Sequence, residues 1–112
     1  MDNFTKYARH THKLFSCSAS LMLPNHRLLP AHTVEISAED LKAVVSENLP
    51  EGLDCLIRLN VPVKPAGAHT VIAHVETRGS VFDGKHGGFL VELRFTAIAA
   101  QSRAVIKDFL GA

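Results

Sequence analysis

The side chains of this sequence that could do chemistry are spread along the chain and form few recognisable groups. Seven histidines occur, and His10 and His12 stand two positions apart, so in an extended segment both would project from one face as metal ligands. No third ligand follows nearby, and we expect no metal site. Cys17 and Cys55 lie far apart without Cys-x-x-Cys spacing, which favours buried, reduced thiols over a disulfide.

Catalysis by a nucleophile is not expected, and neither is a cofactor. Serine, histidine, cysteine and aspartate residues are present but scattered, and no Gly-x-Ser-x-Gly motif occurs. Twelve basic residues against eleven acidic ones give a net charge of +1, which provides no sustained field toward nucleic acid or anionic lipid. Any anion site must therefore be local, and we expect no nucleic-acid polymer as a partner.

The length and composition indicate a single globular domain. The chain has 112 residues, 46% of them hydrophobic, which is enough for a core without disulfides or a structural metal. No apolar run approaches the roughly 18 residues of a membrane span, and the start at Met1–Phe4 lacks the pattern of a signal peptide. We expect a cytoplasmic protein without a membrane span.

Short apolar segments separated by turn residues predict a mainly β chain. The expected strands are Leu14–Leu23, His32–Ile36, Leu41–Val45, Asp54–Val61, Thr70–Phe82 and Phe89–Phe95. Because Pro30 lacks a backbone N–H, the second strand is expected to begin after it, near Ala31. The long fifth strand is expected to bend near Gly79, where glycine permits a bulge.

After Phe95 the apolar residues recur at spacings of three and four, which predicts a terminal helix that stops at Gly111. Six strands and one helix suggest a six-stranded antiparallel β-barrel with a C-terminal α-helix. The expected organisation is a basic arm over 1–13 and a barrel domain with its helix over 14–112. The predicted core comprises Ile57, Leu59, Val91, Leu93, Ile106 and Phe109.

Two polar segments flank the first predicted strands. Arg9 and Lys13 stand with further basic residues in the N-terminal segment, where a solvated arm is as reasonable as a binding role. Ser37 follows the second strand, where a serine hydroxyl more often stabilises a turn than contacts a ligand. The residue types alone do not decide between these alternatives.

The order of elements and these two segments resemble the PilZ domain, a six-stranded barrel family whose members mostly bind the bacterial messenger cyclic di-GMP. The family's Arg-x-x-x-Arg motif corresponds to Arg9–Lys13, with lysine as the second basic residue. Its second motif, Asp or Asn, any residue, Ser, two more residues and Gly, corresponds to Glu35–Asp40, where only Ser37 matches outright. The resemblance implies a PilZ-like barrel and a ligand site at Arg9, Lys13, Glu35, Ser37 and Asp40.

The altered positions imply weak or absent nucleotide binding. An arginine can fork onto phosphate oxygens and stack on a purine, whereas Lys13 supplies only a compact charge. Glu35 is longer by one methylene than the family's Asp, and Asp40 adds a carboxylate where the family has a glycine at an expected positive-φ position. Two hypotheses follow, namely a signalling adaptor with weak cyclic di-GMP binding, or a degenerate module that acts only through contacts with a protein partner.

Overall fold

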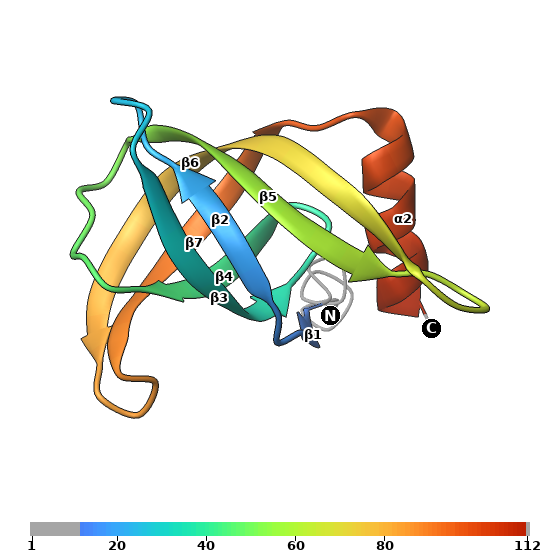
Figure 1. Cartoon of the computed structure of the whole chain (residues 1–112), viewed down its shortest axis with the longest axis horizontal. Helices are drawn as coiled ribbons and strands as arrows, with labels where there is room; N and C mark the ends of the chain where they lie inside the picture. The colour runs from blue at the N-terminus through green and yellow to red at the C-terminus, as the bar shows by residue number, and fades with distance from the viewer. Residues whose placement is uncertain (1–11, 112) are drawn as a thin grey trace, which may run out of the picture.

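The computed structural model describes residues 12–111 as seven strands and one helix. The strands are β1 (Lys13–Leu14), β2 (Ser18–Met22), β3 (Leu28–Ile36), β4 (Asp40–Val45), β5 (Asp54–Pro62), β6 (Ala68–Asp83) and β7 (Gly88–Ala97), and the helix is α2 (Ala100–Gly111). All strand pairings are antiparallel. The expected mainly β fold with a C-terminal helix is therefore confirmed (Figure 1).

Six of the strands close into a barrel built from two successive meanders. The first meander is β2, β3 and β4, and the second is β5, β6 and β7. They join at both edges, because β2 pairs with β5 and β4 pairs with β7. The two-residue strand β1 adds to β3 beside the closed ring.

The barrel interior is filled by alternate residues of each strand, as a period of two requires. On β5 the buried residues are Cys55, Ile57, Leu59 and Val61, and on β7 they are Val91, Leu93 and Phe95. Five of the six predicted core residues are buried. The exception is Phe109, which is only partly buried and packs against the edge of the core.

The first predicted strand divides into β1 and β2, with residues 15–17 between them. Thr33 on β3 causes the interruption, because its hydroxyl donates to the carbonyl of Phe15 at 2.6 Å and accepts from the amide of Cys17 at 2.9 Å. These bonds replace regular ladder bonds, and the register of β3 against β4 also shifts beside Thr33. A buried hydroxyl thus holds the irregular segment in place.

The second predicted strand begins earlier than expected, at Leu28, and includes Pro30. Pro30 pairs with Ser20 of β2, whereas β4 pairs with β3 only from Ala31 onward. The proline therefore lies where β3 has a neighbour on one side, so its missing N–H breaks no pair with β4. The bend expected near Gly79 is confirmed, because the register of β6 against β7 shifts between Thr77 and Gly79.

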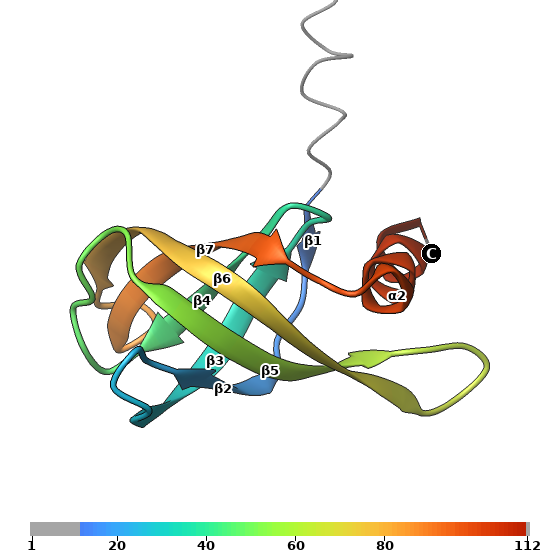
Figure 2. The same ribbon diagram turned by 90° about the horizontal axis from the view of Figure 1, so that it is seen from above.

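Helix α2 lies outside the barrel, alongside the ends of β5 and β6 (Figure 2). It contributes the fully buried Ile106 to the core. The helix ends at Gly111, as the sequence predicts. β1 is also at this end, because Lys13 Nζ of β1 donates to the carbonyl of Phe109 on α2 at 3.0 Å. The ring of Phe15, just after β1, also lies 5.1 Å from the ring of Phe109.

Candidate functional site

The turn between β3 and β4 carries two of the predicted site residues, Ser37 and Asp40. The Ser37 hydroxyl donates to Asp40 Oδ1 at 2.7 Å and accepts from the backbone amides of Glu39 and Asp40 at 3.2 and 3.1 Å. The Ser37 amide donates to the Asp40 carbonyl at 2.8 Å. With 1% of its surface exposed, Ser37 is committed to the turn, as the sequence alternative of a turn hydroxyl proposed.

His12 lies against the two carboxylates of this site. Its Nε2 is 3.1 Å from Asp40 Oδ1 and 4.0 Å from Glu35 Oε1. The carboxylates are mostly covered, with about a quarter of each side chain exposed. Asp40 therefore has partners on two sides, the imidazole of His12 and the hydroxyl of Ser37.

The side chain of Lys13, the first residue of β1, contacts a different part of the molecule from its neighbour His12. Its Nζ donates to the carbonyl of Phe109 at 3.0 Å and lies 4.3 Å from the centre of the Phe109 ring. The ammonium group thus sits at the C-terminal end of α2, where the helix dipole favours a positive charge. A second link joins α2 to the turn, since Arg103 Nη1 donates to the carbonyl of Ala38 at 3.1 Å.

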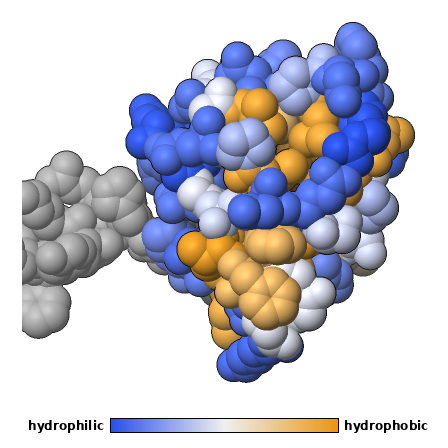
Figure 3. Space-filling view, turned by 90° about the vertical axis from the view of Figure 1, so that its left-hand side faces the viewer, coloured by the Kyte–Doolittle hydropathy of each residue, from blue (hydrophilic) through white to orange (hydrophobic). Residues whose placement is uncertain are grey.

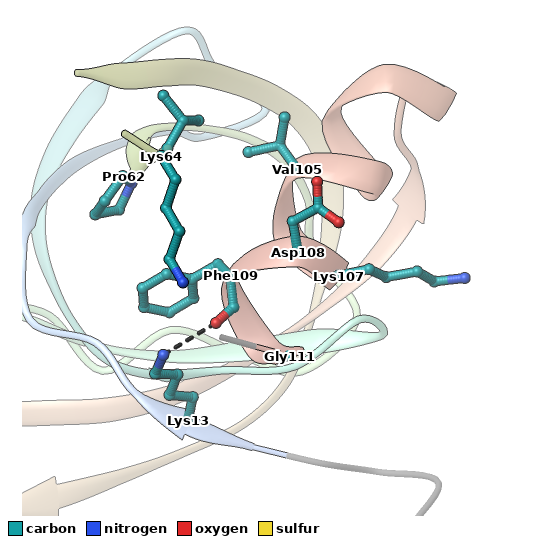
Figure 4. Close-up of a pocket in the computed structure, with 9 residues that line it drawn as sticks. Lys13, Pro62, Lys64, Val105, Lys107, Asp108, Phe109 and Gly111 are labelled. Carbon is teal, nitrogen blue, oxygen red and sulfur yellow. Dashed lines mark hydrogen bonds between the residues drawn. The ribbon is translucent and has the colours of Figure 1, made fainter. Parts of the chain in front are cut away.

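A pocket of about 620 Å³ opens between the end of α2 and the β5–β6 hairpin (Figure 4). Lys13, Lys64 and Phe109 line it together with Val105 and Asp108. Figure 4 shows the bond from Lys13 to Phe109 at the edge of this pocket. Glu35, Ser37 and Asp40 are not among its lining residues.

The predicted site residues are therefore only partly brought together. Glu35, Ser37 and Asp40 cluster around His12, whereas the ammonium group of Lys13 is held at the helix. Arg9 lies outside the described residues. The expectation that Asp40 occupies a positive-φ position is wrong, because Asp40 begins β4 and the positive φ angles of the described chain lie elsewhere.

Three contacts in this region were not predicted from the sequence. His12 contacts Asp40, Arg103 donates to the carbonyl of Ala38, and the carbonyl of Phe109 accepts from Lys13. His12 was recognised only as a possible metal ligand. Nothing in the linear sequence pairs Arg103 with Ala38, because that contact joins distant parts of the chain.

Within the described residues, the remaining histidine, cysteine and acidic side chains form no metal site. Among residues 12–111 no three histidine, cysteine or acidic side chains lie close enough to share a metal ion. Cys17 and Cys55 are free thiols, and burial, with a smaller effect of Asp54, raises the pKa of Cys55. In the same part of the chain no helix is long and apolar enough to cross a bilayer.

Comparison with known proteins finds similarity at the level of structure. No protein-family model matches the sequence, and no curated protein matches it. Among solved structures, the inhibitor of motility of Bacillus subtilis, MotI/DgrA, superposes with a TM-score of 0.78 and 14% sequence identity. The match covers 92% of this chain and 49% of that chain, so this chain spans about half the length of its neighbour. At this identity the similarity shows a shared fold.

Proposed function

We propose that this chain is a PilZ-like signalling adaptor without catalytic activity that binds cyclic di-GMP weakly or not at all. In this proposal it acts mainly through contacts with a protein partner. The motif resemblance in the sequence and the barrel shared with MotI/DgrA support the assignment, and the name of that neighbour describes an inhibitor, which is a regulatory role. The proposal concerns the module that this chain forms, since the neighbour is about twice as long.

The observation that carries the proposal is that the Ser37 hydroxyl is fully used in hydrogen bonds within the Ser37–Asp40 turn. Ser37 is buried and uses its hydroxyl as donor and acceptor within the turn, so a ligand would have to compete with three existing bonds. Asp40 in turn contacts His12. A polar group that already has good partners gains little from a ligand, because binding only exchanges one hydrogen bond for another.

The charges at this turn oppose a dianionic nucleotide. Glu35 and Asp40 present two carboxylates, and at a distance of about 5 Å in an effective dielectric of about 20 each would repel a phosphate by roughly 3 kcal/mol before salt screening. Lys13 could offset this repulsion only by leaving the carbonyl and ring of Phe109. Nucleotide binding would therefore be coupled to loosening of the end of α2.

A calorimetric titration with cyclic di-GMP tests the proposal. We expect weak or undetectable heat with the native chain, and at least a hundredfold gain in affinity when Lys13→Arg, Glu35→Asp and Asp40→Gly are combined, if each change contributes about 1 kcal/mol or slightly more. Asp40→Asn tests the effect of the charge alone. It removes the negative charge, and its amide oxygen can still accept the hydrogen bond from the Ser37 hydroxyl. Its benefit should be larger at low salt, whereas Asp54→Asn, an exposed carboxylate on β5, serves as the matched control.

The titration also separates the two hypotheses. Tight binding by the native chain would contradict the argument from Ser37, Asp40 and Lys13. A folded triple variant that still binds nothing would leave the second candidate, a module that acts only through protein contacts. That candidate has its own support in the exposed apolar side chains of Val81 and Phe82 at one end of the barrel.

A further inference from the structure

The pocket between the end of α2 and the β5–β6 hairpin has two walls that the chain itself holds in place. On the hairpin side, the turn closes with a hydrogen bond from the amide of Val63 to the carbonyl of Gly67 at 3.1 Å. On the helix side, Ile106 is fully buried in the core, and the hydroxyl of Ser102 lies 3.4 Å from His69 Nε2 on β6. The volume of about 620 Å³ lies within the range of about 300–1,000 Å³ that is usual for small-molecule pockets.

The lining of this pocket is apolar over much of its surface. Pro62 and Val63 contribute from the hairpin, and Val105 and Phe109 contribute from α2. Val105 and Phe109 also pack against the core, so their positions are fixed from behind. The pocket therefore offers apolar surface to a ligand without a rearrangement of the fold.

The charges around the pocket are mainly positive. Lys13, Lys64 and Lys107 line it, and Asp108 is the one acidic side chain in the lining. The end of a helix carries a partial negative charge on its free carbonyls, which alone would repel an anion. Lys13 offsets this effect, because its ammonium group already binds the carbonyl of Phe109.

Lys64 is the cation that is available to a ligand. Figure 4 shows its side chain extending from the hairpin toward Phe109, whereas the side chain of Lys107 extends away from the pocket. Within the described residues Lys64 has no hydrogen-bond or ion-pair partner. One ammonium group without a partner thus lies beside apolar surface.

We propose that this pocket binds a small amphiphilic carboxylate, whose anionic group contacts Lys64 and whose apolar body lies against Val105 and Phe109. A single free ammonium suits a group with one negative charge, which favours a carboxylate over a dianionic phosphate. Burial of the apolar body supplies most of the affinity, since each buried methylene contributes about fourfold. The Ser37–Asp40 turn does not line this pocket, so the inference goes beyond the proposed function.

Calorimetric titration of the full chain with octanoate tests the proposal. Binding should be saturable, and butanoate should bind about tenfold more weakly or less, because it has four fewer methylenes to bury. Octyltrimethylammonium carries the same alkyl chain with the opposite charge. It should also bind about tenfold more weakly than octanoate, because it meets the positive charge of Lys64.

Two substitutions with opposite effects identify the charged contact. Lys64→Met should weaken octanoate binding about three- to fivefold, and Asp108→Asn should strengthen it about twofold, because the first removes an attraction and the second a repulsion. Lys85→Met is the matched control, since Lys85 is an exposed lysine in the distant β6–β7 hairpin. Thermal melts establish that all variants remain folded.

A second control excludes association with exposed apolar surface elsewhere. Figure 3 shows an apolar patch on the side of the molecule where Figure 1 places the β6–β7 hairpin. Phe82 is 68% exposed on β6 and lies outside the pocket lining, so Phe82→Ser should leave the affinity for octanoate unchanged.

Three results would overturn the proposal. They are the lack of saturable octanoate binding up to about 10 mM, weaker rather than stronger binding by Asp108→Asn, and a loss on Phe82→Ser as large as that on Lys64→Met. Since no nucleotide is involved, the outcome does not depend on the titration with cyclic di-GMP.

Discussion

Replacing Ser37 by alanine should destabilise the protein by about 2 kcal/mol. The hydroxyl accepts two backbone amide bonds and donates one bond to the carboxylate of Asp40. A hydrogen bond contributes about 1 kcal/mol net and more when a charged group takes part, but Asp40 is partly exposed and water can replace some of what is lost. The loss should therefore resemble that of a serine cap at a helix N-terminus, about 0.5–2 kcal/mol, toward its upper end.

Urea denaturation followed by circular dichroism measures this loss as a shift of the midpoint at constant slope. Ser46→Ala is the control, because Ser46 is exposed just after β4 and its truncation should change stability by less than about 0.5 kcal/mol. If Ser37→Ala has as small an effect as the control, the Ser37 hydroxyl is not committed to the turn. The structural argument against nucleotide binding at this site would then fail.

Three further outcomes are expected. Leu93→Ala should cost about 2–5 kcal/mol in denaturant melts because Leu93 is fully buried, and a loss below about 1 kcal/mol would contradict its place in the barrel. Lys13→Met should cost about 1 kcal/mol by removing the bond and the ring contact at the end of α2, whereas the same change at the exposed Lys107 should be neutral. Cys55 should label slowly with a thiol reagent at neutral pH, since burial raises its pKa, and the half-buried Cys17 should label faster; equal rapid labelling would contradict this.

The sequence predicted the barrel well because its interior follows a simple period. Alternation along Cys55–Val61 and Phe89–Phe95 identified the two strands that contribute most clearly to the core, and both are confirmed. The bend near Gly79 was also predictable, since glycine is the residue that permits such backbone geometry. These features depend on neighbouring residues, which a single sequence displays directly.

The details of the site depend on distant contacts and were not predictable in the same way. The break after β1 arises from the hydroxyl of Thr33, which belongs to another strand. The role of Lys13 depends on Phe109 at the opposite end of the chain. A lysine in a basic segment resembles a phosphate ligand in sequence, and only the fold shows that it holds a helix carbonyl instead.

The construction of the barrel from two meanders has a consequence for how the chain assembles. Within each meander, every strand pairs with the next strand along the chain, so both halves can form from local contacts. The pairings of β2 with β5 and of β4 with β7 bring distant segments together, and we expect them to form later. Each half therefore presents two unpaired edges whose natural complement is the other half. We expect that a chain cleaved in the loop between β4 and β5 would yield two fragments that associate through these edges and restore the closed ring.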